Sequence, residues 1–209
     1  MLTFVAVVVG LLGLVSTARA QEKKNGAPLF GHVDVAQVLN ESKARQKDVA
    51  ELTQMASGLN GVLESLQNVN ARFLAEAEIK ELAVLYEKAN KTDADKKRIT
   101  ALEDSGNAKA ARKRNLENTA NPTDEQQQQF GQLRETEEKG LAVMKAINDD
   151  FSKRINARQV ELNNKTVSEI KAVIAKIAQD KGLSAVFDSQ VAIWTANDIT
   201  QDVIKQINK

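Results

Sequence analysis

Histidine and cysteine, the side chains most often used in nucleophilic catalysis and metal binding, are almost absent from this chain. His32 is the only histidine and cysteine is absent, which excludes thiolate chemistry, disulfides and zinc sites that need several such ligands. Asp34 and Asp188 lie on segments with strand-like alternation, and paired carboxylates can do acid–base work. We expect them instead to cap a strand edge or turn, and His32 to lie on a strand face or at a subunit contact. Sequences of the GxxxxGK and GxSxG types do not occur. The sequence therefore predicts a protein that is not an enzyme and uses no cofactor or metal.

A basic excess lies in the middle of the chain, where eight basic residues stand against four acidic ones between Lys91 and Leu116. Its two clusters are Lys96, Lys97, Arg98 and Arg112, Lys113, Arg114. Near an anionic surface each basic residue contributes about 1 kcal/mol, so this segment could capture acidic partners or touch a membrane surface peripherally. The alternative is an ordinary solvated helix face. Nucleic acid is not expected as a partner, because the segment has no aromatic side chain on which a base could stack.

Composition favours long helices over a compact sheet enzyme. Of the 209 residues only 4% are aromatic and two are proline, while 27% are charged. Such a chain buries little apolar surface per residue and suits extended, solvent-exposed helices. Much of it is therefore expected to lie outside any single core.

The first twenty residues are typical of an export signal. Leu2 to Val15 is an uncharged apolar run, too short for a membrane span of about 20 residues. Ala18, Arg19 and Ala20 then form the small-x-small pattern of a signal-peptidase site, which predicts cleavage after Ala20. No Lys or Arg precedes the apolar run, so an uncleaved anchor remains an alternative. Loss of Arg19 would leave 28 basic residues against 28 acidic ones, a formally neutral protein.

Strand-like segments lie near both ends of the exported part. Leu29 to Val35 partly alternates apolar and polar residues after a proline. Near the other end, Leu183 to Asp188 and Val191 to Thr195 alternate around the Ser189–Gln190 break, which predicts a β-hairpin. We expect Gly182 to end the preceding helix. A short final helix is expected from Asp198, with Gln201 completing a capping box.

The residues between these ends are helix-periodic. Steps of four and three place apolar or small residues at Leu52, Ala56, Leu59, Leu63, Leu66, Phe73 and Ala77, and on the return at Phe130, Leu133, Leu141, Met144, Phe151, Ile155 and Leu162. Such heptads specify helices that supercoil around a partner, so the two stripes should zip together as an antiparallel hairpin. The arms are expected at about 41–103 and 123–179, with the reversal within 91–122 and a kink near Gly58 and Gly61.

Other apolar residues fall off this seam. They are Val62, Val69, Leu74, Ile79, Val84 and Ile147. We expect them to face a cavity, where they would touch an unfolded partner weakly and often.

The chain resembles the OmpH family of periplasmic, Skp-like chaperones. The resemblance is most specific at its two ends, in Val33–Ser42, in Gly182–Asp188 and in Asp198–Lys205, and it extends through the long charged helices between them. It implies a homotrimer in which strands of three subunits form one body. Helical tentacles would enclose a cavity that shelters unfolded outer-membrane or exported proteins without ATP. The subunit interface would then include Val33, Val35, Val186, Phe187, Ile193 and Trp194.

The expected fold class is α+β, a small β-body of one N-terminal strand, a C-terminal hairpin and a short helix, with a long antiparallel coiled-coil hairpin. Residues 1–20 would be the signal peptide, 21–40 and 180–209 the discontinuous body that oligomerises, and 41–179 the helical hairpin. The expected function is an ATP-independent periplasmic holdase. The alternatives are a structural coiled-coil spacer or scaffold of the cell envelope and an anchored subunit of an envelope complex.

Overall fold

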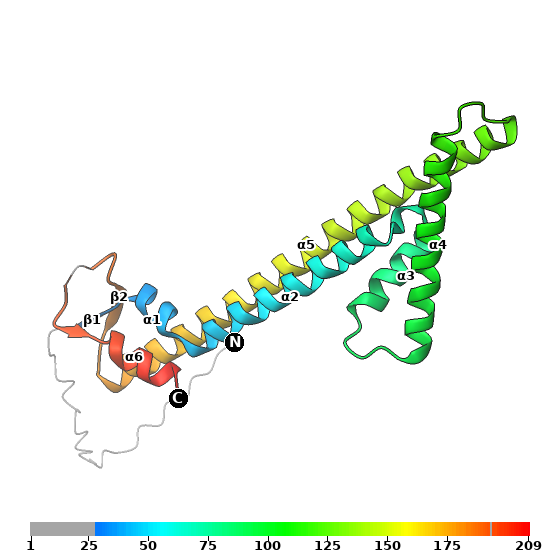
Figure 1. Ribbon diagram of the computed structural model, residues 1–209. Coiled ribbons are helices and arrows are strands. Elements are labelled where there is room, and N and C mark those ends of the chain that lie inside the picture. The colour runs from blue at the N-terminus through cyan, green and yellow to red at the C-terminus, as the bar shows by residue number, and fades with distance from the viewer. Residues whose placement is uncertain (1–27, 193) are drawn as a thin grey trace, which may run out of the picture.

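The computed structural model describes residues 28–192 and 194–209. The predicted signal peptide and its cleavage site lie outside these residues. Figure 1 shows a small body, which contains both ends of the described chain, and a long helical limb that projects from it. Within the described ranges, no helix is both long and apolar enough to cross a membrane.

A three-stranded parallel sheet forms the centre of the body. β1 (Phe30–Val33) lies between β2 (Ala185–Asp188) and β3 (Asn197–Asp198), and both neighbours run parallel to it. Phe30 pairs with Ala185 and Gly31 with Asn197 in the register of the sheet. The first and last parts of the chain are therefore joined by backbone hydrogen bonds.

The expected β-hairpin is wrong in its second strand. After β2, the N–H groups of Val191 and Ala192 both donate to the carbonyl oxygen of Asp188, which turns the chain away from the sheet. The chain then returns on the far side of β1, where the N–H of Ile199 donates to the carbonyl oxygen of His32. The second edge of β1 is filled by residues 197–198 in parallel pairing, while the described part of 191–195 forms no strand beside β2.

Two short helices and the end of the longest helix complete the body. α1 (Val35–Glu41) begins at Asp34, and α6 (Thr200–Ile207) begins two residues later than expected, because Ile199 is its N-cap and no capping box forms. Their apolar sides bury a core with the end of α5: Val33, Val38, Ile170, Ile177, Ile199, Val203 and Ile204. Gly182 follows the last turn of α5 with φ +65°, which confirms it as the helix-ending residue.

The limb is built on α5 (Asp124–Asp180), a single helix of 57 residues that is about 85 Å long at 1.5 Å per residue. α2 (Lys43–Asn68) packs antiparallel along the half of α5 nearer the body (Figure 1). Gly58 and Gly61 both lie inside α2, which runs as one continuous helix past them. The zipped pair of helices is thus confirmed for Leu59, Leu66 and Phe151, which share one buried cluster.

The outgoing arm is not one helix to residue 103. Asn70 adopts a left-handed conformation (φ 56°), after which a 3-10 turn, η1 (Ala71–Phe73), redirects the chain. α3 (Glu76–Glu87) then turns back and packs against α2 and α5, and α4 (Asp93–Glu117) runs past η1 toward the distal end (Figure 1). The outgoing arm therefore has three helical segments, with α3 and α4 forming a side hairpin.

The reversal lies at residues 118–123, between α4 and α5. Thr123 begins α5 with a capping box to Gln126. The other expected breakers, Asp104 to Asn107, lie inside α4. The structure thus confirms the α+β class with long helices and shows which of the breakers reverses the chain.

Candidate functional site

The β-body leaves large apolar side chains in contact with solvent. They lie at the start of β1, on β2 and in the turn after it, and their exposed fractions are Leu29 53%, Phe30 44%, Phe187 39%, Val191 77% and Trp194 79%. The Phe30 and Phe187 rings pack in a tilted arrangement, with centroids 5.9 Å apart and an interplanar angle of 57°. A small body seldom exposes such a set unless another surface covers it. We call these five residues the body patch.

The expected interface residues divide between this patch and the body core. Val33 is 2% exposed, and Val35 and Val186 are half-buried against the same core. Phe187 and Trp194 belong to the body patch, whereas Ile193 lies outside the described residues. A partner could therefore reach the two aromatic residues directly.

The remaining polar residues that could do chemistry have structural roles. His32 Nδ1 lies 3.0 Å from the Thr195 hydroxyl and its Nε2 3.7 Å from Asp198. Asp34 accepts from the Gln37 N–H and caps α1, and Asp188 accepts from the Gln190 N–H. Asp188 thus caps a turn, as expected, whereas Asp34 caps a helix. Among the described residues no group of His, Asp and Glu side chains is arranged to hold a metal ion.

Most of the apolar residues expected to face a cavity are buried. Val62, Leu74, Ile79 and Ile147 are at most 8% exposed and join the cluster in which α2, α3 and α5 meet, and Val69 packs against it. That expectation is wrong for Val62, Ile79 and Ile147, because α3 folds against the α2–α5 pair and supplies a second buried face. Leu74 also lines the groove described below. Val84, on α3, is 59% exposed. The limb also exposes Val49, Val160 and Val167, which the sequence patterns did not single out. Leu141 was expected in the seam between the two arms, but it is 52% exposed, so that expectation is wrong.

The basic residues do not gather at one place. Lys96, Lys97 and Arg98 lie in the first turns of α4, beside the α3–α4 turn, and Arg112, Lys113 and Arg114 lie near its other end. About 24 Å of helix separates the two clusters. Within them, Lys96 pairs with Asp93, Arg98 with Glu81 and Lys113 with Glu137. Only the second cluster is close to the reversal at 118–123.

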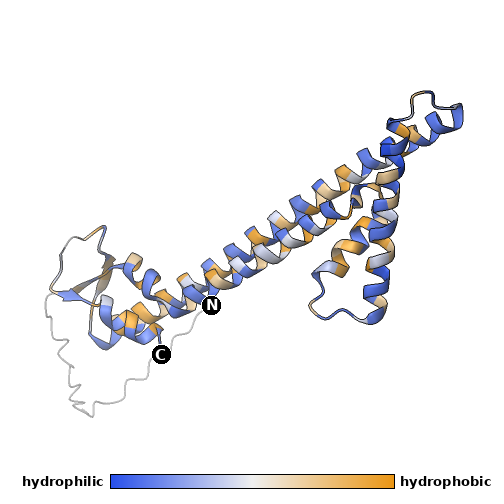
Figure 2. Ribbon diagram, in the orientation of Figure 1, coloured by the Kyte–Doolittle hydropathy of each residue, from blue (hydrophilic) through white to orange (hydrophobic). Residues whose placement is uncertain are grey.

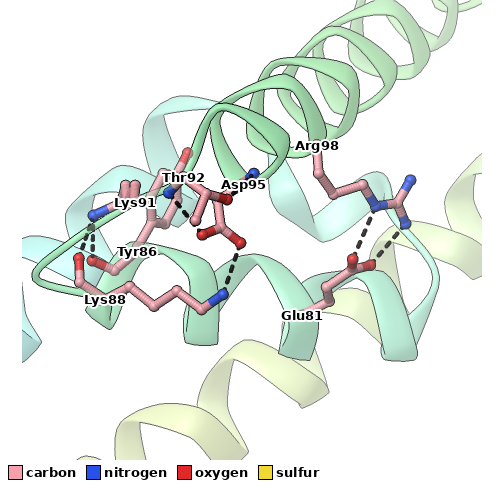
Figure 3. Close-up of polar contacts among 7 residues, drawn as sticks. All are labelled: Glu81, Tyr86, Lys88, Lys91, Thr92, Asp95 and Arg98. Atoms are coloured by element: carbon pink, nitrogen blue, oxygen red, sulfur yellow. Dashed lines mark hydrogen bonds and ion pairs between the residues drawn. The ribbon is translucent and has the colours of Figure 1, made fainter.

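The α3–α4 turn is closed by a dense set of polar contacts (Figure 3). Lys91 Nζ donates to the carbonyl oxygens of Tyr86 and Lys88, and Arg98 makes two hydrogen bonds to Glu81, of 2.9 and 2.7 Å. Hydrogen bonds from Lys88 and from the Thr92 backbone lower the pKa of Asp95 to about 2. Burial, together with the 2.7 Å hydrogen bond to Glu103, raises the pKa of Tyr86. The side hairpin is thus held in a defined shape.

Two glycines set the junction at η1, which we call the elbow. A Cβ on Gly106 of α4 would lie 2.7 Å from the carbonyl oxygen of Val69, and one on Gly140 of α5 would overlap the backbone of Arg72. Arg72 and Lys113 both pair with Glu137, at 3.0 and 2.9 Å. Burial opposes ionisation of Glu137, but the hydrogen bonds from Lys113 and Arg72 outweigh it and lower its pKa.

A groove of about 700 Å³ opens beside the elbow, between α3, α4 and α5. Apolar groups line its floor, including Leu74, Val143 and Ala146. Lys80, Lys109 and Lys139 stand around it with a single acidic residue, Glu76. Figure 2 shows hydrophobic colouring on α3 and on the body, and hydrophilic colouring over most of the distal end of the limb.

No curated protein and no solved structure matches this chain. A family model described as "Outer membrane protein (OmpH-like)" matches residues 29–207, the body and the limb together. Membership implies a periplasmic chaperone role without enzymatic activity, in agreement with the sequence prediction. This chain belongs to the OmpH-like family.

Proposed function

We propose that this protein is an ATP-independent periplasmic holdase. It would act as a homotrimer whose limbs surround unfolded outer-membrane or exported proteins. The observation that carries the proposal is that a small body exposes five large apolar side chains and bears a limb built on a helix about 85 Å long. The signal peptide would be cleaved after Ala20.

The body patch supports oligomerisation through the body. Phe187 lies on β2, and Val191 and Trp194 lie in the segment that follows it; all three are exposed. Aromatic residues are enriched in the buried centres of protein interfaces. Each copy of the body would cover the patch of another copy. The limbs would then project from one common body.

The limb supports weak and repeated client contact. Its exposed apolar residues Val49, Val84, Leu141 and Val160 are scattered over several helices and do not form one deep pocket. Burial of one such side chain contributes about 1–2 kcal/mol, so a client held by several of them can still dissociate without ATP. The clusters around Lys97 and Arg114 add attraction for acidic segments, with at most peripheral contact with anionic membrane surfaces.

An aggregation assay tests the proposal. A denatured outer-membrane β-barrel protein is diluted into buffer with and without an excess of this protein, and light scattering is followed at moderate salt. We expect the scattering to be suppressed. Unchanged aggregation would reject the holdase and favour a structural coiled-coil spacer.

A further inference from the structure

We infer that the groove beside the elbow is a binding site for an extended client segment in which apolar residues alternate with acidic ones. This inference rests on the proposed holdase function and assigns one site to it. The site differs from the scattered contacts described above, because helices from three parts of the chain converge to form it.

The floor of the groove provides the apolar half of this recognition. Leu74 is 1% exposed and lies where η1 leads into α3, while Val143 and Ala146 come from one side of α5. Small side chains at Ala142 and Ala146 leave the space open. A volume of about 700 Å³ is within the roughly 300–1,000 Å³ typical of ligand sites.

The rim provides the charged half. Lys80 pairs with Glu76 and Lys139 with Glu135, each at 2.6 Å, whereas Lys109 takes part in none of the ion pairs among the described residues. With Glu76 counted against Lys80 and Glu135 against Lys139, the charge of Lys109 remains as an excess of one positive charge at the groove. This charge favours an acidic occupant and disfavours a basic one.

An extended strand matches both halves. Its side chains point alternately to opposite faces, so one face can rest on the apolar floor while acidic side chains turn outward toward the lysines. Strands of outer-membrane barrels alternate apolar and polar residues over about 9–11 positions. The occupant is therefore an unfolded barrel strand with acidic residues on its polar face.

The test uses the full-length mature protein and a labelled peptide of about nine residues in which Val and Asp alternate. Binding is followed by fluorescence anisotropy. Ala146→Trp fills the groove, and Ala157→Trp, also on an exposed site of α5, is its control. Lys109→Glu reverses the rim charge, and Lys153→Glu is its control. Circular dichroism checks the helix content of every variant.

We expect Ala146→Trp and Lys109→Glu each to weaken peptide binding at least about fivefold, and both controls to stay within about twofold. A peptide with Lys in place of Asp should bind at least about tenfold more weakly. The proposal is overturned by equal binding of the basic peptide or by groove variants that match their controls. It is also overturned if the wild-type protein does not bind the Val–Asp peptide, which would be the result if a second copy of the chain covered the groove. Wild type that suppresses aggregation but fails these tests rejects the groove alone, whereas wild type that does not suppress aggregation rejects the holdase.

Discussion

Gly140 of α5 lies directly against the backbone carbonyl of Arg72 in η1. Because the two backbones come this close, the chain can turn at η1 after α2 and form the α3–α4 side hairpin, while α5 continues as one helix. A side chain at position 140 would have to displace main-chain atoms, which cannot move as a flexible side chain does. The close contact between α5 and η1 therefore requires a residue without a Cβ at position 140.

We expect Gly140→Ala to lower the free energy of unfolding by about 1–3 kcal/mol, because the added Cβ overlaps the Arg72 backbone. Gly131→Ala on the same helix is the matched control, since nothing lies within 4 Å of its Cβ position. There Ala should stabilise by about 0.5–1 kcal/mol, because it has a higher helix propensity than Gly. Urea unfolding measures both. Equal effects of the two substitutions would show that the elbow is not closely packed.

Asn70 should be replaceable by Gly but not by Ala. Its φ of 56° is a left-handed conformation, which costs a residue such as Ala about 1–2 kcal/mol. Asn70→Gly keeps the backbone and loses only an exposed hydrogen bond to Asn107 of 2.8 Å. In urea unfolding the Gly variant should therefore be the more stable of the two. An Ala variant as stable as the Gly variant would contradict the turn after α2.

The ion pairs of Glu137 should make the elbow sensitive to acid. The pKa of Glu137 is lowered in the folded protein, so its contribution is fully present above the unfolded pKa of about 4.3 and is lost as the pH falls through the folded value. We expect Glu137→Gln to lower the free energy of unfolding by about 1 kcal/mol at pH 7. The difference from wild type should shrink as the pH falls below about 4.3, the unfolded pKa. A difference that stays constant from pH 7 to pH 3 would exclude a contribution from the charge.

The body patch should control assembly without being needed for the fold of one subunit. Trp194 is 79% exposed, so Trp194→Asp should leave helix content unchanged. In an assembled body it would bury an unpaired charge, which costs several kcal/mol, and the protein should become monomeric. Phe187→Asp should act in the same way. Molar mass from light scattering checks this, with Val84→Asp on the exposed side of α3 as the control that keeps its assembly. A trimer that persists in Trp194→Asp would place the interface elsewhere.

The sequence predicted the ends of the chain better than its middle. Alternating apolar and polar residues in Leu29–Val35 and Leu183–Asp188 predicted β1 and β2. The place of Gly182 after a helix predicted its positive φ. The pairing of residues 197–198 with β1 could not be predicted, because two residues carry no periodicity. Val191 to Thr195 alternates, yet the N–H groups of Val191 and Ala192 both donate to the carbonyl oxygen of Asp188, so the chain turns away and β2 remains at the edge of the sheet.

The side hairpin escaped prediction because the heptad spacing continues through the elbow. Phe73 and Ala77 follow Leu66 at the expected steps, although the helix ends at Asn68. The elbow forms through contacts with Gly106 and Gly140, which lie 36 and 70 residues beyond Asn70. Local patterns do not encode such distant contacts. Ile79 and Val62 are buried because the elbow brings α3 against α2 and α5. The heptad spacing alone could not predict their burial.

The most direct test of the holdase proposal compares wild type with Trp194→Asp in suppressing the aggregation of a denatured outer-membrane β-barrel protein, at equal subunit concentration. Wild type should suppress light scattering, and the monomeric variant should suppress it much less, because separate limbs cannot surround a client. Aggregation that is equally rapid with wild type, with the variant and with buffer alone would contradict the holdase.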